Sequence, residues 1–343
     1  MVFGISLPTA ATPYCSAAAR PEQRWVSAED FTTAARMTVG LGLLALPFAL
    51  RERLLAFVAR RRTRSKAGPR FRSVARMTAL LAGETARDPR TLLFQWHRHH
   101  LAYELLVLRT ALGGKPDFPY LLRGSEHLHA ALARGRGVVF WGMPFLYVPL
   151  VPAIVLYREG LASVALSRWT HGYARTRLGA ALLNPIRVRA ENRFLLDRVV
   201  IGRNCSPLPA LRRLLDELRH NRPVSILLAP LAERLLDVPF AGGRLRVPSG
   251  PLRLAARARC PVLPVCCWWE DGRFVVEIDE PLPALADGDR GTQAAAELAR
   301  RLEIRVRRVP DQFHWPNPSF VPPHLAVAAT GRTQGRGGPQ PSS

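Results

Sequence analysis

The histidine best placed for proton-transfer chemistry in this 343-residue sequence is His171, in the segment SRWTHGYARTRLG. Imidazole is the side chain that most often takes a proton in general base catalysis. Arg168 and Arg175 flank this histidine, and guanidinium groups hold phosphate groups through paired hydrogen bonds. The segment therefore predicts a base beside a bound phosphate group. The alternative interpretation is a loop histidine among solvated arginines.

A second histidine pattern, His-x4-Glu, occurs at His99 and Glu104 within an apolar, helix-periodic stretch. Five residues advance about 500° around a helix of 3.6 residues per turn, which leaves these two side chains about 140° apart. His100 and Glu104, four residues apart, share one face instead. The pattern therefore predicts pairing on a helix surface and not a catalytic pair.

Short, continuous apolar runs predict the strands that would position His171. Such runs are typical of strands buried on both faces of a sheet. They are LASVALS (161–167), GVVFWGM (137–143), PVSILLA (223–229) and CPVLPVCCWW (260–269). FVVEID (274–279) alternates and predicts a strand nearer an edge. Helix-periodic segments separate the runs, so we expect an α/β fold with a mixed, mostly parallel central sheet, helices on both faces and further helices before it.

His171 directly follows one of these predicted strands. Active sites of open α/β sheets lie at the carboxyl ends of the strands. The sequence thus predicts that His171 lies at the mouth of the sheet.

The N-terminal part predicts contact with a membrane. Residues 37–50 are apolar and uncharged, and as one helix they would reach roughly 21 Å at about 1.5 Å per residue. That is short of the ~30 Å hydrocarbon core, so an interfacial or dipping helix is expected. Residues 51–72 contain many arginines and a single acid, Glu52. We expect this segment to lie on the anionic, cytoplasmic face of the plasma (inner) membrane, peripherally or anchored by the N-terminus; a solvated basic helix end is the alternative.

Composition limits the partners. The net charge of +23 is nearly all arginine and suggests an anionic partner, either lipid or nucleic acid. No helix-turn-helix or zinc-finger spacing accompanies the charge, so nucleic acid is not expected. The five cysteines form no spaced framework, which predicts reduced thiols and no metal site. We divide the chain into a membrane-facing segment (1–70), an α/β domain (71–320) and a disordered tail (321–343).

Four landmarks occur in a fixed order along the α/β domain. They are GSEHLHAALARGRGVVF (124–140), DVPFAGGRLRVPSGPLRLAARARCPVLPV (237–265), FVVEIDEPLP (274–283) and PDQFHWPNPSF (310–320). Together they resemble the lysophospholipid acyltransferase superfamily, in the branch that includes the bacterial lipid A acyltransferases. The resemblance implies a glycerolipid acyltransferase-like fold and a lipid acceptor hydroxyl. It also implies acyl-CoA or an acyl-carrier protein as co-substrate, with no bound cofactor.

The resemblance also implies a catalytic His-x4-Asp/Glu motif after the strand that here reads GVVFWGM. Placing the chain on that motif sets Pro144 at the histidine and Pro149 at the acid. Neither proline side chain can accept a proton. The usual chemistry therefore requires a replacement base, for which His171 is the candidate.

Substrate contacts are expected on the landmark turns. Glu233 is the nearest acid after the third predicted strand, where related enzymes often keep an acidic residue, and it would orient a base or bind the acceptor. The turn and helix-start motifs add further expected substrate contacts, at Phe240, Gly242, Arg244, Ser249 and Gly250. The backbone N–H groups of a helix start are a ready anion site.

Two functions are compatible with these residues. The first is a divergent, membrane-associated acyltransferase that uses His171, with Glu233 as its acid. The alternative is a non-catalytic protein of the same fold that binds acyl lipids or acyl carriers.

Overall fold

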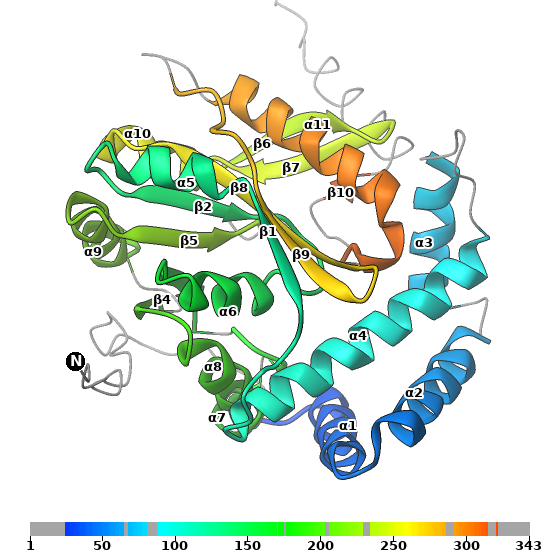
Figure 1. Ribbon diagram of the computed structural model, residues 1–343. Coiled ribbons are helices and arrows are strands. Elements are labelled where there is room, and N and C mark those ends of the chain that lie inside the picture. The colour runs from blue at the N-terminus through cyan, green and yellow to red at the C-terminus, as the bar shows by residue number, and fades with distance from the viewer. Residues whose placement is uncertain are drawn as a thin grey trace, which may run out of the picture.

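A seven-stranded central sheet organises the computed structural model (Figure 1), which describes residues 25–64, 68–80, 88–169, 171–174, 176–202, 206–228, 234–285, 291–314 and 320–321. In sheet order the strands are β1 (Tyr120–Arg123), β9 (Arg273–Ile278), β8 (Val262–Glu270), β2 (Val138–Gly142), β5 (Pro223–Leu227), β3 (Val164–Arg168) and β4 (Asp197–Ile201). Neighbouring strands pair in parallel, except that β8 and β9 are antiparallel. The mixed, mostly parallel sheet expected from the sequence is confirmed.

Helices on both faces bury the central strands. All five residues of β2 are buried, as a strand between two helical layers requires. Helices α9 (Leu208–Arg219) and α10 (Gly250–Ala258) contact each other and cover one face, while α6 (Val151–Arg158) lies against the other (Figure 1). Helix α5 (Ser125–Leu132) packs on β2 and β9. Connections between parallel strands are almost always right-handed. Connections that run one way along the sheet therefore place their helices on one face, and connections that run the other way place theirs on the opposite face.

The apolar runs became β2, β3, β5 and β8, and the alternating segment became β9, as predicted, but β1 and β4 were missed. Strand β1 is a four-residue, half-buried edge strand, and β4 begins with the charged pair Asp197 and Arg198. Neither has the apolar run from which the other strands were predicted. A second sheet was missed as well: β6 (Leu235–Phe240) and β7 (Gly243–Pro248) form a hairpin that β10 (Phe320–Val321) joins, and β6 packs on α11 (Thr292–Arg308).

The expected single helix over residues 37–50 is wrong. Helix α1 (Ala28–Leu44) ends before this stretch does, and α2 (Phe48–Thr63) begins directly after Pro47. Proline has no N–H for a helical hydrogen bond and disfavours the helical conformation of the residue before it, which explains the break. Among the described residues, no helix is both long enough and apolar enough to span a bilayer.

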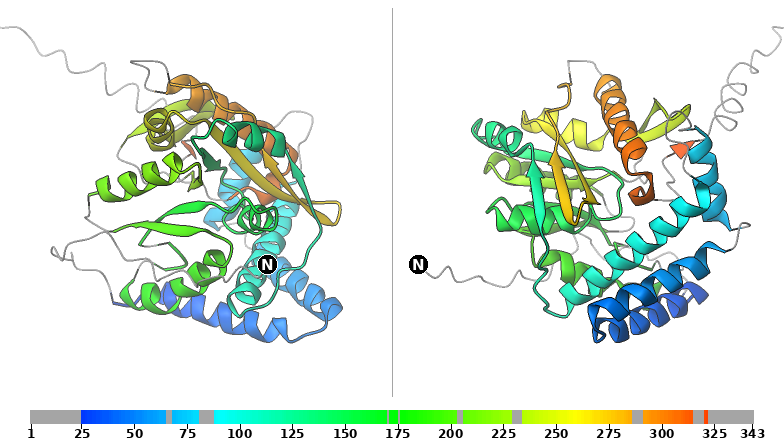
Figure 2. Two further views of the ribbon diagram at one scale, coloured as in Figure 1. Left: turned by 60° about the vertical axis from the view of Figure 1, so that its left-hand side comes forward. Right: turned by 45° about the vertical axis from the view of Figure 1, so that its right-hand side comes forward.

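Helix α4 (Pro89–Ala111) connects the N-terminal helices to the sheet. Helices α1 and α2 pack along it (Figure 2), and Leu55 of α2 and Leu105 and Leu108 of α4 share a small apolar core. Helix α3 (Pro69–Leu80) contacts α4, and α8 (Asn184–Asn192) is a further neighbour of α4. The predicted tail over residues 321–343 lies outside the described residues, apart from its first residue.

Candidate active site at the carboxyl edge of the sheet

His171 lies at the carboxyl end of β3, as its place in the sequence predicted. Its backbone N–H donates to the carbonyl oxygen of Arg168, the last residue of β3, at 2.9 Å. The imidazole lines a cavity of about 60 Å³ together with Gly142, Leu227 and Pro149. Gly142 and Leu227 are the last residues of β2 and β5. The cavity therefore reaches the edge where three parallel strands end, which is where open α/β sheets bind their substrates.

The partner of His171 is Glu191 on α8, a residue that the sequence reasoning missed. The distance from His171 Nε2 to Glu191 Oε2 is 2.7 Å. The imidazole is 19% exposed and the carboxylate 4% exposed. A buried carboxylate at this distance fixes the orientation of the ring, as in other base–orienter pairs.

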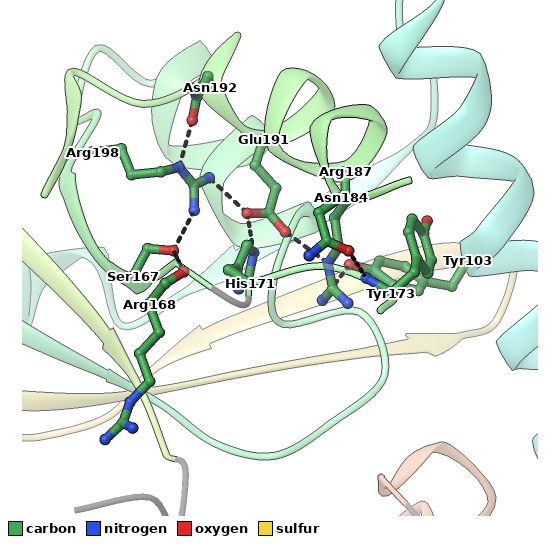
Figure 3. Close-up of polar contacts among 10 residues, drawn as sticks. All are labelled: Tyr103, Ser167, Arg168, His171, Tyr173, Asn184, Arg187, Glu191, Asn192 and Arg198. Atoms are coloured by element: carbon green, nitrogen blue, oxygen red, sulfur yellow. Dashed lines mark hydrogen bonds and ion pairs between the residues drawn. The ribbon is translucent and has the colours of Figure 1, made fainter. Parts of the chain in front are cut away.

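Two arginines hold the Glu191 carboxylate from its other sides (Figure 3). Arg187 donates from Nε to Oε1 at 3.0 Å, and Arg198 donates from Nη2 to Oε2 at 2.7 Å. Arg198 is itself held by Ser167 and Asn192. Burial alone would raise the pKa of the Glu191 carboxyl, but His171 and the two arginines lower it well below its usual range. Glu191 is therefore ionised at neutral pH.

The geometry leaves Nδ1 as the nitrogen that would do chemistry. Glu191 is an acceptor, so the neutral imidazole carries its hydrogen on Nε2 and a lone pair on Nδ1. Nδ1 has no hydrogen-bond partner in the described part of the chain. A hydroxyl within hydrogen-bonding distance of Nδ1 could give up its proton there.

Asn184 at the start of α8 clamps the loop that carries His171. Its Oδ1 accepts hydrogen bonds from the backbone N–H groups of Tyr173 and Ala174, and its Nδ2 donates to the carbonyl oxygen of Ala174. Gly172, between the histidine and this clamp, has φ +144° and lies against the Asn184 side chain. Only glycine adopts that backbone region without strain, and an added Cβ would overlap Asn184.

Replacing Gly172 by alanine is therefore expected to lower the free energy of unfolding by about 1–3 kcal/mol and to displace the His171 loop. Chemical denaturation followed by tryptophan fluorescence measures the first effect. Gly160→Ala is the matched control, because Gly160 also has a positive φ (+73°) but has open space around it. Equal losses in both variants would show that Asn184 does not constrain the loop.

Both prolines lie near this site. Pro144 follows β2, and its carbonyl oxygen accepts from the backbone N–H of His314 at 2.9 Å. Pro149 lines the His171 cavity. No ionisable side chain is present at either position.

The other predicted residues are distributed over the fold. Arg168 is exposed and points away from the Glu191 cluster (Figure 3). Arg175 and Glu233 lie outside the described residues. The residues predicted on the landmark turns do not line the His171 cavity: they are Phe240, Gly242, Arg244, Ser249 and Gly250. Phe240 is fully buried core, and the Arg244 side chain donates to the backbone of Asp237. Their contact with substrate stays a prediction.

His99 does not pair with Glu104, as expected from helix geometry. Glu104 instead lies 3.7 Å from His100 Nδ1, on the predicted shared face. His99 Nδ1 lies 2.9 Å from the hydroxyl of Tyr147, and its Nε2 lies 3.4 Å from Asp311 Oδ2. This second pair of a histidine and a carboxylate was also missed. Its partners are distant in sequence, so no spacing pattern could reveal it.

In the part of the chain that the structure describes, no group of three His, Cys, Asp or Glu side chains could hold a metal ion. Cys266 and Cys267 are buried free thiols in β8, and burial raises the pKa of both, so they stay protonated.

Comparison with known proteins gives one consistent family. The family model described as bacterial lipid A biosynthesis acyltransferase matches residues 26–320. The chain is 27% identical over 206 residues to a phosphatidylinositol mannoside acyltransferase of Mycolicibacterium smegmatis, covering 57% of this chain and 60% of that protein. It is 28% identical over 220 residues to the phosphatidylinositol mannoside acyltransferase of Mycobacterium tuberculosis, covering 59% and 60% of the two chains. The matches thus span about three fifths of these relatives. Because the family model covers most of its length, the chain belongs to the bacterial lipid A biosynthesis acyltransferase family.

Proposed function

We propose that this protein transfers a fatty acyl group from a thioester donor, acyl-CoA or an acyl-carrier protein, to a hydroxyl group of a lipid. The observation that carries the proposal is the His171–Glu191 pair, in a cavity at the carboxyl edge of the sheet. The pair supplies a base and a carboxylate where Pro144 and Pro149 supply neither. Family membership supports acyl transfer as the reaction, and the names of the relatives favour a glycolipid acceptor.

In this mechanism Nδ1 of His171 takes the proton of the acceptor hydroxyl as its oxygen attacks the thioester carbonyl carbon. A C–O bond forms, the C–S bond breaks, and the proton passes from the imidazolium to the departing thiolate. Glu191 also lines the cavity, but its carboxylate is bonded to His171, Arg187 and Arg198. It is a positioning residue that orients the ring and stabilises its charge, while Arg187 and Arg198 keep the carboxylate ionised.

The experiment is a transfer assay with purified protein, radiolabelled acyl-CoA and acyl-carrier donors, and a panel of lipid acceptors. The panel includes phosphatidylinositol mannosides and acyl-deficient lipid A precursors. Labelled acyl ester on a lipid, lost on addition of excess unlabelled donor, supports the proposal. Absence of ester with every donor and acceptor would contradict it.

A specific observation favours a second function, binding without chemistry. Pro144 and Pro149 stand where the resemblance places the catalytic His and acid. In that case the protein would retain acyl lipids or acyl carriers without forming ester. Lipid co-purification and equilibrium binding, without turnover in the transfer assay, would establish this alternative.

The proposal includes a peripheral position on the anionic, cytoplasmic face of the plasma membrane. The outer surfaces of α1 and α2 support it, because they expose large apolar side chains: Phe31, Val39, Phe48 and Phe57 are each at least 60% exposed. Arg51, Arg53, Arg60 and Arg61 lie on α2 beside them. Apolar and basic side chains together are typical of helices that lie in a membrane interface.

The salt dependence of vesicle binding tests the proposed position on the membrane. Raising the salt from about 0.1 M to 1 M shortens the Debye length from about 10 Å to 3 Å, so we expect most of the protein to leave anionic vesicles. Co-sedimentation with phosphatidylglycerol vesicles measures the release, with neutral phosphatidylcholine vesicles as the control. Retention at 1 M salt would show that apolar insertion dominates, and equal binding to neutral vesicles would exclude a role for the arginines.

A further inference from the structure

A second and larger cavity lies between the N-terminal helices, away from the strands. It measures about 290 Å³ and is lined by residues of α1, α2 and α4. Most of the lining is apolar, including Met37, Leu43, Leu55, Val58, Leu101 and Leu105. In another protein an apolar cavity of about 150 Å³ stays dry and binds benzene, so this cavity has room for roughly twelve carbon atoms.

Charged side chains join the apolar wall of the cavity. Arg36, Arg62 and Glu104 all line it. Arg36 Nη1 lies 3.5 Å from Glu104 Oε1. Its Nε is buried and has no hydrogen-bond partner among the described residues. Two arginines and one glutamate give this part of the lining a net positive charge, which complements an anionic group.

Tyr173 connects this cavity to the candidate active site. Its side chain lines the cavity, and it lies two residues after His171. The Arg187 guanidinium carbon lies 6.0 Å from the centre of the Tyr173 ring, and Arg187 holds Glu191. A molecule in the cavity would thus contact the residue that packs on the His171–Glu191 cluster.

We propose that the cavity between α1, α2 and α4 binds one fatty acyl chain whose anionic head group lies at Arg36. The apolar lining matches a hydrocarbon chain, and the partly exposed side chain of Arg36, with the net positive charge around it, matches a carboxylate or phosphate. This site is additional to the cavity of the proposed reaction; only the choice of a lipid as ligand rests on the proposed function. Since α1 and α2 also carry the exposed apolar side chains, the chain would enter from the membrane side.

Filling the cavity tests the proposal. A conjugated polyene fatty acid, whose fluorescence rises in an apolar site, is titrated into the full-length protein without donor or acceptor. Val58→Trp and Leu43→Trp place a larger side chain at half-buried lining positions and should each weaken binding about tenfold or more, because several methylene contacts are lost. The matched controls are Leu50→Trp and Leu41→Trp, at exposed positions of the same helices that do not line the cavity. The controls should bind as the unaltered protein does.

Ligands with different head groups distinguish a carboxylate from a phosphate as the anion that binds at Arg36. A fatty acid, a lysophosphatidic acid and an uncharged fatty alcohol of equal chain length compete with the fluorescent probe. Arg36→Gln should weaken the binding of the two anions and leave that of the alcohol unchanged, whereas Arg109→Gln, at an exposed position of α4 outside the cavity, should alter none of them. Stronger competition by one anion identifies a carboxylate or a phosphate as the preferred head group.

The proposal is overturned if the polyene fatty acid does not bind, or if Val58→Trp and Leu43→Trp, folded by circular dichroism, bind as their controls do. It is also overturned if Arg36→Gln affects the alcohol as much as the anions. Failure of the transfer assay with lipid binding intact would contradict the proposed reaction alone. The two proposals therefore fail separately.

Discussion

Replacing His171 by glutamine is expected to lower the rate of acyl transfer about 10²–10⁴-fold, the usual contribution of a positioned general base. Glutamine keeps a polar side chain of similar length but cannot take the proton of the acceptor hydroxyl. Lipid binding should change little, because the imidazole contributes only part of the lining of one cavity. Initial rates at saturating donor and acceptor, with equilibrium binding measured separately, test both expectations.

His129→Gln is the matched control for this variant, because His129 is an exposed histidine on α5, away from the cavity. It should leave the rate unchanged. Transfer that survives in His171→Gln would show that the base lies elsewhere. His99, which contacts Asp311 and Tyr147, would then be the next residue to replace.

The second large effect is expected for Glu191→Ala, which should lower the free energy of unfolding. Without the carboxylate, Arg187 and Arg198 would stay largely buried with no anion between them. Removing one partner of a buried ion pair costs about 3–5 kcal/mol, because the remaining charge is left uncompensated. Urea denaturation measures this loss.

Glu217→Ala is the control for the stability effect. Glu217 is as buried as Glu191, but its partners Arg213 and Arg222 are 43% and 51% exposed, so water can hydrate them when the carboxylate is removed. We expect a clearly smaller loss than for Glu191→Ala. Equal losses of unfolding free energy would mean that Glu191 stabilises the fold through its buried arginines no more than Glu217 does through its exposed ones.

The lowered pKa of Glu191 also predicts how stability depends on pH. A carboxyl whose pKa is lower in the folded than in the unfolded protein stabilises the fold above its unfolded pKa, about 4.3 for glutamate. This contribution is lost as the pH falls below that value toward the folded pKa. The unaltered protein should therefore lose more stability than Glu191→Gln between neutral and acidic pH.

The kinetic constants of acyl transfer test separately whether Glu191 positions the base. Glu191→Gln should lower kcat with little change in KM, because the carboxylate acts on the imidazole and not on the bound substrates. A purely structural role would instead lower stability and leave kcat per folded molecule unchanged.

Local sequence predicted most of the sheet and the position of His171. The continuous apolar runs that became β2, β3, β5 and β8 reflect burial on both faces, which is a property of each segment alone. His171 follows one of them, so strand direction placed it at the carboxyl edge. Predictions failed where the local signal was weak, as in β1 and β4, or where one residue interrupted it, as Pro47 does between α1 and α2.

The partners of the histidines were decided by tertiary structure alone. Glu191 is 20 residues from His171, on a helix whose sequence, NPIRVRAEN, reads as an ordinary charged surface. Asp311 approaches His99 from the far end of the chain. Such pairs form because the sheet and α4 bring distant segments together, and no periodicity of 2 or 3.6 residues carries that information. The sequence by itself therefore determined which strand carries the histidine. The packing of α8 against α4, and its hydrogen bonds to the loop after β3, decided which carboxylate meets it.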